Sequence, residues 1–431
     1  MAGMTRRNLL AAAPALYLGK AAAADKIVIA CIGVRGRAGH LMRGFASMPD
    51  IEIATLVDID ERQFEPALKS LAEKGRKAPR TTGDFRRVLD DKSIDAVVVG
   101  TPDHWHAIPS IMACQAGKHV YVEKPCSHNL REGQAMLAAA RKHDRVMQVG
   151  IQSRSGRHFA EALEYIRSGA LGKVTFARGW ETARQKSIGH PADADPPAGV
   201  DYDMWLGPAP KRRFNPNRFH SNWRWFFDYG TGDLGNDGVH RIDYARRALE
   251  AGFTGMGKKL PEWPTAVAAA GGKHFFDDDQ EWPDNSIVTW DYPGALLTYE
   301  MRIWTGSKME GEEEGGAVYG ENGHVVIGNT GWRAFGPKGE PLPRKGGQSS
   351  NDEHDPAHKR DFADAIRNHR RPNCDIAIGH VSSSMTHLGN IAWRVDRKLK
   401  FDAAKQEFVG DEEANRLLGR TYRAPWVLPR V

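Results

Sequence analysis

Cysteine is scarce in this sequence, with four residues in 431 and no CxxC pair. The four residues, Cys31, Cys114, Cys126 and Cys374, lie far apart along the chain. This spacing argues against a zinc site and against a dense disulfide framework. Internal repeats of about 20 to 50 residues are also absent, which excludes a repeat architecture.

Charge of one sign is not concentrated anywhere. The 60 basic and 54 acidic residues are interspersed, and the formal net charge is +6. An even distribution of this kind is not the footprint of a nucleic-acid-binding protein, so we expect no nucleic-acid partner. The apolar run from Leu9 to Leu18 is shorter than the roughly 20 residues that a membrane-spanning helix needs, so we expect no stable membrane insertion.

The N-terminus has the order of an export signal. Arg6 and Arg7 form a twin-arginine pair, an apolar run follows, and alanines precede Asp25. We interpret residues 1–24 as a twin-arginine signal peptide, which would place the mature protein in the periplasm or outside the cytoplasm. The alternative is an ordinary disordered or amphipathic start.

Length and composition indicate a folded protein of two domains. The chain has 41% hydrophobic and 26% charged residues, and 431 residues exceed what one hydrophobic core usually serves. Strand-like and helix-like segments alternate from residue 25 to residue 154, as in "KIVIACIG", "HLMRGFASM" and "IEIATLVDI". Such alternation predicts a doubly wound parallel sheet, a Rossmann domain, with a nucleotide site at the carboxyl ends of its strands.

The first strand ends in a glycine-rich turn, "GVRGRAGH". Gly33 and Gly36 fit a phosphate-binding turn, but Arg35 and Ala38 occupy places where the dinucleotide fingerprint has glycine. We predict that Gly33, Arg35, Gly36 and Arg37 contact a dinucleotide pyrophosphate at the start of the next helix. A plain strand-helix turn is the alternative.

The second strand ends in "VDID". Asp58 can accept hydrogen bonds from a ribose diol and would repel a 2′-phosphate, so the sequence favours NAD over NADP. An acidic residue at this place is often only a helix cap, and Asp60 can serve that purpose.

Four stretches together resemble the glucose-fructose oxidoreductase, inositol dehydrogenase and MocA family: "GTPDHWHA", "VYVEKP", "QVGIQSRS" and "GDLGNDGVHRID". The likeness runs from about residue 26 to the C-terminal "RAPW". It implies an N-terminal Rossmann domain and a C-terminal α/β domain, here residues 155–431, built on an open, mostly antiparallel sheet. It also implies hydride transfer between a sugar or cyclitol hydroxyl and a nicotinamide.

The segment "EKP" carries the first catalytic candidate. Lys124 follows a predicted parallel strand, where an ammonium can bind the reacting hydroxyl and stabilise the oxyanion that develops as hydride leaves. Glu123 can fix the strand end or touch the cofactor, and Pro125 restricts the turn. The resemblance implies that Lys124 faces the nicotinamide and that a cis bond precedes Pro125. A solvated lysine at a strand end is the alternative.

The neighbouring strand end, "GTPDHWHA", places Thr101, Pro102, His104 and His106 near the crevice, and the resemblance implies that they contact the cofactor. The two histidines are two residues apart and do not share a helical face, so we expect no metal site.

Beyond the last Rossmann strand, Gln152 matches a family position beside the nicotinamide. Arg154 is a candidate for binding substrate oxygens.

The second catalytic candidate lies in "GNDGVHRID". Asp237 and His240 are three residues apart and project from one helical face, where an imidazole and a carboxylate can act as a general base. The resemblance implies the same role for His240. Many family members have aspartate four residues before this histidine, where this chain has Asn236, so the role of Asp237 is open. A satisfied buried histidine is the alternative.

A long segment, residues 183–230, is rich in proline, asparagine and aromatic residues. Trp223 is a candidate for stacking on a sugar ring, and packing of the segment on its own domain is an equal alternative. Later strands such as "SIVTWDY" predict a sheet with one face free for a partner subunit, so we expect a homodimer or homotetramer. His387 is placed near the crevice.

Three hypotheses for function remain. The leading one is an exported NAD-dependent sugar or cyclitol oxidoreductase. The second is an NAD-dependent glycosidase, which oxidises, eliminates and reduces again on the same fold. The third is a non-catalytic sugar- or nucleotide-binding protein.

Overall fold

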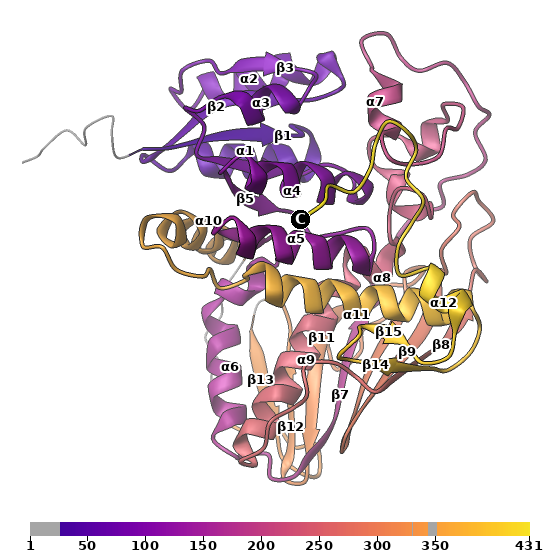
Figure 1. Ribbon diagram of the computed structural model, residues 1–431. Coiled ribbons are helices and arrows are strands. Elements are labelled where there is room, and N and C mark those ends of the chain that lie inside the picture. Colours follow the sequence, from indigo (N-terminus) through magenta and orange to yellow (C-terminus); the bar gives the residue numbers. More distant parts are fainter. Residues whose placement is uncertain (1–25, 330, 344–350) are drawn as a thin grey trace, which may run out of the picture.

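The computed structural model describes residues 26–329, 331–343 and 351–431. The predicted signal peptide lies outside these residues. In Figure 1 the chain forms an upper α/β unit, in indigo and purple, and a lower unit in which helices cover a broad sheet.

The upper unit is a parallel sheet with the strand order β3-β2-β1-β4-β5-β6. This is the doubly wound order of a Rossmann domain, as predicted. Within the described residues its strands are β1 (Ile27–Ile32), β2 (Ile51–Val57), β3 (Arg80–Thr82), β4 (Ala96–Val99), β5 (His119–Val122) and β6 (Met147–Val149). Its helices are α1 (Gly36–Ala46), η2 (Glu61–Gln63), α2 (Phe64–Ala72), α3 (Arg86–Asp90), η3 (Asp103–Trp105), α4 (Ala107–Gln115), α5 (Leu130–Lys142) and η4 (Gln152–Ser155).

Central strands of this sheet form because they are apolar on both faces. All four residues of β4, the sequence AVVV, are buried, since helices cover the sheet on its two sides. The parallel strands end at one edge, and the loops that follow β1, β2, β4 and β5 meet there.

The lower unit contains a sheet with the order β13-β12-β11-β7-β10-β9-β8-β14-β15. Among the neighbours with a recorded register, only β7 and β10 run parallel, so the predicted open, mostly antiparallel sheet is confirmed. Its described strands are β7 (Val174–Glu181), β8 (Ala266–Gly272), β9 (Asn285–Tyr292), β10 (Ala295–Arg302), β11 (Glu314–Gly320), β12 (Gly323–Ile327), β13 (Trp332–Phe335), β14 (Leu399–Asp402) and β15 (Glu407–Phe408).

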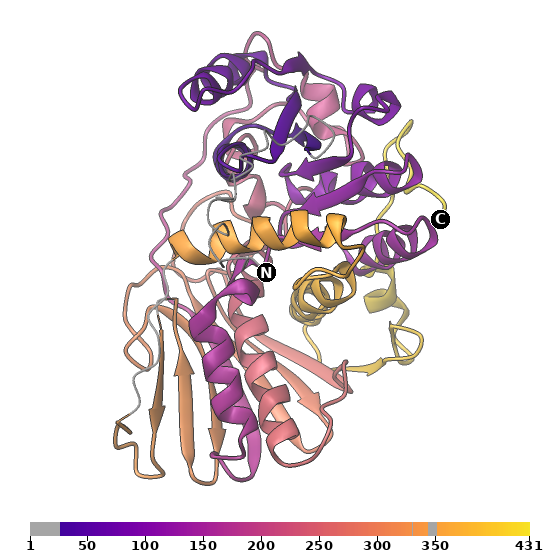
Figure 2. The ribbon, with the colours of Figure 1, turned by 90° about the vertical axis from the view of Figure 1, so that its left-hand side faces the viewer.

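Helices cover one face of this sheet, and Figure 2 shows α6 and α9 side by side in front of the strands. Strand β9 shows the reason, since its residues alternate between buried and partly exposed, the pattern of a half-covered strand. The helices of this unit are α6 (Arg157–Arg167), α7 (Tyr202–Leu206), η5 (Pro216–Arg218), η6 (Asn222–Trp225), α8 (Gly232–Asn236), α9 (Gly238–Gly255), α10 (Asn351–Arg367), α11 (Ile376–Arg394) and α12 (Glu412–Arg416).

Two late segments return to the Rossmann unit. Phe362 of α10 joins the core cluster that includes β1 and α1, and Tyr422, Trp426 and Leu428 pack against the core on the other side of the parallel sheet. Residues 155–431 are therefore not a separate body, because their last elements complete the first domain.

Candidate active site

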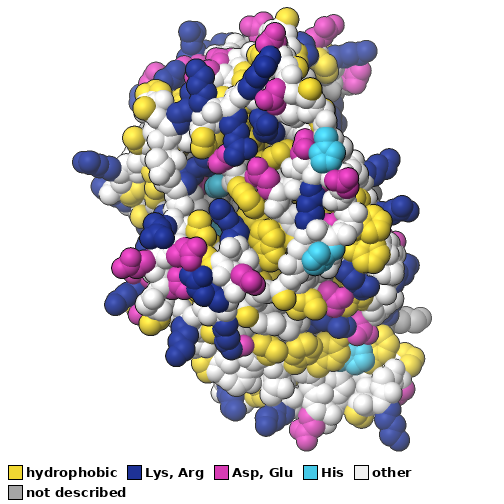
Figure 3. All heavy atoms as spheres, turned by 90° about the vertical axis from the view of Figure 1, so that its right-hand side faces the viewer, with side chains coloured by type: hydrophobic (Ala, Val, Ile, Leu, Met, Phe, Trp, Pro, Cys, Tyr) yellow, Lys and Arg dark blue, Asp and Glu magenta, His cyan; other side chains and the backbone are white. Residues whose placement is uncertain are grey.

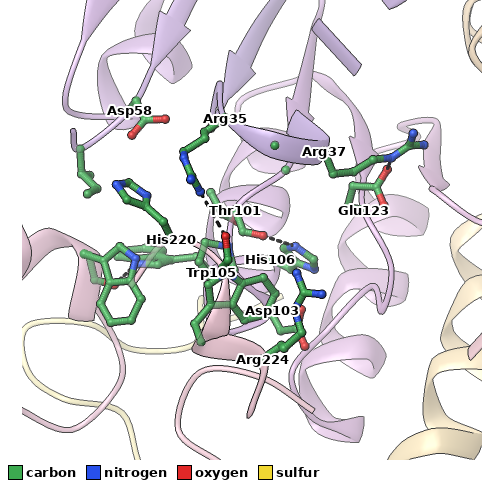
Figure 4. Close-up of a pocket in the computed structure, with 18 of the residues that line it drawn as sticks. Arg35, Arg37, Asp58, Thr101, Asp103, Trp105, His106, Glu123, His220 and Arg224 are labelled. Carbon is green, nitrogen blue, oxygen red and sulfur yellow. Dashed lines mark hydrogen bonds and ion pairs between the residues drawn. The ribbon is translucent and has the colours of Figure 1, made fainter. Parts of the chain in front are cut away.

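A cavity of about 250 Å³ lies at the carboxyl edge of the parallel sheet. Figure 4 shows side chains converging on it from the Rossmann strand ends and from the segment that carries His220 and Arg224. Eleven predicted site residues line it: Gly33, Arg35, Gly36, Arg37, Asp58, Thr101, Pro102, His106, Glu123, Lys124 and Trp223. The residues predicted from separate parts of the sequence thus lie together along one wall of a single cavity.

The glycine-rich turn has the shape that a phosphate-binding turn needs. Gly33 has φ +87°, and a Cβ there would lie 3.0 Å from the Gly100 carbonyl oxygen. Ala38 takes the place of the fingerprint's third glycine, and the close approach is permitted by Gly100, where a Cβ would lie 2.6 Å from that of Ala38. Helix α1 begins at Gly36, and Gly36 and Arg37 of its first turn line the cavity, so the turn fits a dinucleotide despite its irregular sequence.

The two aspartates after β2 have different tasks. Asp58 lines the cavity and is held by the backbone N–H groups of Val34 (3.0 Å) and Asp60 (3.1 Å), and burial raises the pKa of its carboxyl. Asp60 caps η2 through the N–H of Arg62 and accepts a hydrogen bond from His220 at 2.8 Å. The cap is thus Asp60, which leaves Asp58 for a ribose.

The end of β4 supplies an unpartnered donor. The Thr101 hydroxyl is buried and has no hydrogen-bond partner among the described residues, as expected of a group that awaits a ligand. The His106 ring bridges the carbonyl oxygens of Thr101 (2.8 Å) and Pro125 (2.7 Å), tying two strand ends together.

His104 is placed differently from the prediction. Its ring nitrogens lie 2.9 Å from the Trp205 carbonyl oxygen and 3.4 Å from that of Tyr229, and burial lowers its pKa to about 3. The ring is a neutral link to the lower unit and does not line the cavity, because carbonyl groups occupy both nitrogens.

Glu123 fixes the strand end. It accepts from Arg37 at 2.7 Å and from the Lys124 backbone N–H at 3.2 Å. Arg37 also pairs with Asp355 of α10 at 2.6 Å, so α1, β5 and α10 are joined around one guanidinium.

Lys124 extends into the cavity from the end of β5. Its ammonium donates to the Asn236 carbonyl oxygen at 2.8 Å and to Asn236 Oδ1 at 3.2 Å, and lies 3.9 Å from Asp237 Oδ1. The side chain is 14% exposed, and the peptide bond before Pro125 is cis, as the resemblance implied. Lys124 is not a solvated surface lysine, because the protein positions its charge.

His240 lies in the first turn of α9 and is 8% exposed. Burial, with the nearby charges of Lys124 and Arg241, holds its pKa well below the usual range, so the imidazole is neutral at physiological pH. Neither His240 nor Asp237 lines the cavity described above. Asp237 is the residue before α9, and its carboxylate accepts from Asn236 at 3.0 Å while lying near Lys124.

A carboxyl group that we did not single out lies beside these residues. Asp233 of α8 is 1% exposed, and neither of its oxygens has a hydrogen-bond partner among the described residues. Burial and the charge of Asp237 raise its pKa to about 7. Asp233 stands in the stretch "GDLGND" that carries the family resemblance, but the spacing of this stretch does not show whether the side chain is buried or exposed.

Two predicted residues after β6 do not reach the cavity. Arg154 is buried and forms an ion pair with Asp243 of α9. A buried aspartate thus holds its guanidinium, and the role of Arg154 in binding substrate oxygens stays a prediction. Gln152 begins η4, and its side-chain oxygen is enclosed without a partner, so its predicted place beside the nicotinamide stays a prediction.

The long segment 183–230 both packs on its domain and closes the cavity. Trp205 and Trp225 belong to the main core of the lower unit, and Trp205, Trp223 and Arg224 line the cavity. Part of the segment thus packs on its domain, and stacking of Trp223 on a sugar ring stays a prediction. His387 lines a second pocket, away from the predicted crevice.

Residues on the second wall were missed by sequence reasoning. Asp103, Trp105, Met204, His220, Ser221 and Arg224 line the cavity. Asp103 and Trp105 stand inside the motif "GTPDHWHA", so the sequence pointed to their neighbourhood. Residues 204–224 reach the cavity only because an irregular segment folds back over it, and apolar periodicity does not predict such a path.

The described residues contain neither a metal-binding cluster nor a membrane-spanning helix. No group of three or more His, Cys, Asp or Glu side chains is arranged to hold a metal ion there. In the same part of the chain, no helix has the length and apolar character for crossing a bilayer.

Comparison with known proteins follows the two units. Residues 27–151 match an oxidoreductase family described as having an NAD-binding Rossmann fold, and residues 180–252 and 348–428 match the C-terminal α/β domain of the same family.

Curated relatives are matched over part of their length. Levoglucosan dehydrogenase from Pseudarthrobacter phenanthrenivorans is 29% identical over 216 residues, 49% of this chain and 47% of that protein. A glycosyl hydrolase family 109 protein from Shewanella sp. (strain W3-18-1) is 26% identical over 154 residues, 35% of this chain and 34% of that protein. The chain thus matches less than half the length of these relatives.

Solved structures share the whole fold. Aldose-aldose oxidoreductase from Caulobacter crescentus, complexed with glycerol, aligns with a TM-score of 0.64 and 23% identity over 87% of this chain and 100% of that one. Levoglucosan dehydrogenase with NADH and levoglucosan aligns with a TM-score of 0.65 and 19% identity over 87% of this chain and 99% of that one. With both domains matched in sequence and the fold shared, the chain belongs to the Gfo/Idh/MocA family of oxidoreductases, which bind NAD through a Rossmann fold.

Proposed function

We propose that this protein transfers a hydride between a sugar or cyclitol hydroxyl and NAD. The observation that carries the proposal is the position of Lys124, whose ammonium is held by Asn236 and which lines the same cavity as the glycine turn and Asp58. Bound NAD would supply the hydride acceptor.

Lys124 has the role of binding and polarising the hydroxyl. Its contacts with Asn236 hold the ammonium in place before substrate arrives, and a preorganised cation stabilises the oxyanion that develops in the transition state. A substrate hydroxyl would replace the weaker contact, with the Asn236 side chain.

His240 has the role of proton acceptor. A neutral imidazole can take a proton, and the positive charges that lower its pKa favour passing that proton on. Asp237 supplies negative charge 3.9 Å from the Lys124 ammonium. Asp237 stays the candidate for the carboxylate that the family often carries where this chain has Asn236.

The substrate class is supported by the cavity wall and by the relatives' names. Trp223 and Arg224 present an aromatic face and a guanidinium, groups that suit a polyhydroxylated ring. The relatives named levoglucosan dehydrogenase and aldose-aldose oxidoreductase act on sugars by name.

The test is a panel of aldoses, anhydrosugars and cyclitols assayed with NAD at the NADH absorbance, in wild type and in the Lys124→Ala variant. We expect at least one substrate for wild type and loss of turnover with intact NAD binding in the variant. NAD binding without turnover on the whole panel would favour the third hypothesis, a sugar- or nucleotide-binding protein.

An NAD-dependent glycosidase is the second candidate, favoured by the family 109 glycosyl hydrolase relative. Such an enzyme would use the same Lys124 and His240. Cleavage of a chromogenic glycoside without net NADH accumulation would identify it.

We also propose that the protein is exported and forms a homodimer or homotetramer. The order of residues 1–24 supports export. The alternation along β9, whose Ile287 is 51% exposed, supports a partner subunit on the sheet face away from the buried side chains. Size-exclusion chromatography with light scattering tests the assembly.

A further inference from the structure

A second pocket, of about 340 Å³, lies between the two units. It is bounded by the start of α5, residues 227–231, the second half of α11 and the segment after α12. In Figure 1 these elements lie toward the right. Figure 3 faces that side and shows Lys and Arg side chains around hydrophobic side chains that gather at its middle.

Three arginines from separate places in the chain line this pocket, which we call the arginine pocket: Arg394, Arg416 and Arg420. No ion pair joins any of them to a carboxylate in the described part of the chain. The one acidic residue of the lining, Asp228, already pairs with Arg212 at 2.7 Å. The lining therefore carries more arginine than carboxylate, while the charges of Glu281 and Glu132 act on Arg394 and Arg420 from outside it.

Contacts within the protein leave some hydrogen-bond donors of the Arg420 guanidinium without a partner among the described residues. One terminal nitrogen donates to the Asp228 carbonyl oxygen at 3.1 Å and lies 3.4 Å from His128 Nδ1, while Nε is buried without a hydrogen-bond partner among the described residues. Burial, with the positive charge of Arg420, holds the pKa of His128 well below its usual range. His128 is thus a neutral neighbour and adds no competing charge.

Aromatic rings form another part of the wall. Trp282 is 5% exposed and meets Phe227 edge to face at 4.5 Å, and the Arg394 guanidinium lies 4.5 Å from the Phe227 ring centre. Flat apolar surface next to guanidinium groups suits a small ring that carries an anion.

We propose that the arginine pocket binds a sugar-sized molecule bearing an oxyanion, either a carboxylate or a phosphate. The anion would lie between Arg416 and Arg420, whose planar donors match both groups, and the ring would lie against Trp282. The volume is in the range of small-molecule sites, about 300 to 1,000 Å³.

This pocket is distinct from the NAD cavity, although one residue borders both regions. The Thr231 carbonyl oxygen accepts from Asn390 of the arginine pocket at 2.8 Å. Its hydroxyl donates at 2.8 Å to Asp103, which lines the NAD cavity. The binding experiment must therefore be done with the NAD cavity filled.

The test is calorimetric titration of the NAD-saturated full chain, in a chloride buffer of low ionic strength, with glucuronate, glucose 6-phosphate and neutral glucose. We expect one of the two sugar anions to bind at least about 10-fold more tightly than glucose, and which one binds distinguishes carboxylate from phosphate. Arg416→Gln and Arg420→Gln should each weaken that anion about 10-fold or more.

Two controls decide the location. Arg167→Gln removes one exposed positive charge at the end of α6 and should leave the affinity unchanged. Lys124→Ala should also leave it unchanged, whatever it does to turnover. The proposal is overturned if neither anion binds better than glucose, if both pocket variants bind like wild type, or if binding is lost in Lys124→Ala.

Discussion

At the scale of single residues, the site depends on where one ammonium is held. Lys124 is fixed between the end of β5 and the Asn236 carbonyl oxygen, so its charge is in place before the substrate hydroxyl loses its proton. A donor of this kind acts mainly in the transition state.

Lys124→Ala should therefore lower kcat about 100- to 1000-fold and change NAD affinity little. Steady-state assays measure kcat, and titration of the same preparation with NAD measures the affinity. Lys142→Ala, which removes an exposed lysine at the end of α5, serves as the control. Retention of more than about a tenth of wild-type kcat, a loss under about 1.4 kcal/mol, would make the lysine structural.

Asp58 should set the choice of dinucleotide. Its carboxylate is held at the cavity by two backbone N–H groups, so it is available to a ribose diol and repels a 2′-phosphate. We expect NAD to bind more tightly than NADP, and Asp58→Ala to narrow the difference about 10-fold, as measured by titrating both dinucleotides. Asp90→Ala, an exposed carboxylate elsewhere, should leave the ratio unchanged. A wild-type preference for NADP would refute the assignment.

Asp233 should make stability depend on pH. Its pKa of about 7 in the folded protein exceeds the value of about 4 in an unfolded chain, so the folded state binds more protons between these values. The contribution of Asp233 to the free energy of unfolding therefore falls as pH rises from about 4 to 7.

Asp233→Asn removes this dependence. The variant should gain stability relative to wild type on going from pH 4 to pH 8, by on the order of 2 to 4 kcal/mol, in urea unfolding at the two pH values. Asp103, also raised to about 7, is present in both proteins and cancels in the difference. An equal difference at both pH values would show that folding does not raise the pKa of Asp233.

Sequence reasoning predicts the place of residues at strand ends better than contacts between distant segments. Lys124, Asp58 and Thr101 follow strands of a parallel sheet, whose order places them at one edge. The ion pair of Arg154 with Asp243 of α9 was not predicted, because no local pattern shows that a guanidinium is already paired.

At the scale of elements, the segment from residue 199 to residue 221 is hydrogen-bonded to the Rossmann unit beside the cofactor cavity. It is bonded to the Rossmann unit at several points, by Glu61 N–H to the Gly199 carbonyl oxygen (2.9 Å), by Asp201 N–H to the Ile59 carbonyl oxygen (2.9 Å) and by His220 to Asp60 (2.8 Å). All of these lie next to Asp58, where a ribose is expected.

His220→Ala should therefore weaken NAD binding about 10-fold, the typical effect of one hydrogen bond to a charged group, with a smaller change in kcat. Quenching of tryptophan fluorescence by NAD gives the affinity, since Trp105 and Trp223 line the cavity. His190→Ala, in the same long segment but paired with Asp279, is the matched control. Unchanged affinity in His220→Ala would show that the contact of segment 199–221 with Asp60 does not contribute to NAD binding.

The elements themselves were predicted where apolar periodicity is strong. The buried strands β1 and β2 fall on the segments "KIVIACIG" and "IEIATLVDI", β5 precedes Lys124, and the long helix α9 carries His240, all as predicted. Short strands such as β3 and β15 have two or three residues, too few to show a period, and they form because a neighbouring strand edge is available.

At the scale of the whole molecule, the location of the protein is a separate prediction. Fusion of residues 1–24 to a folded reporter should carry it across the inner membrane, because the segment has the order of a twin-arginine signal. Replacing Arg6 and Arg7 with lysine should stop transport, as seen by fractionation. A reporter that stays in the cytoplasm with both sequences would show that the segment is not a signal.

The return of the tail to the first domain has a consequence for synthesis. Trp426 packs edge to face on Trp105 at 4.7 Å, and Trp105 lines the NAD cavity. A ribosome adding about 5 to 20 residues per second makes Trp105 at least roughly 15 seconds before its partner emerges. During that interval the nascent Rossmann domain exposes an uncovered apolar face, which is a natural binding surface for a chaperone at the ribosome.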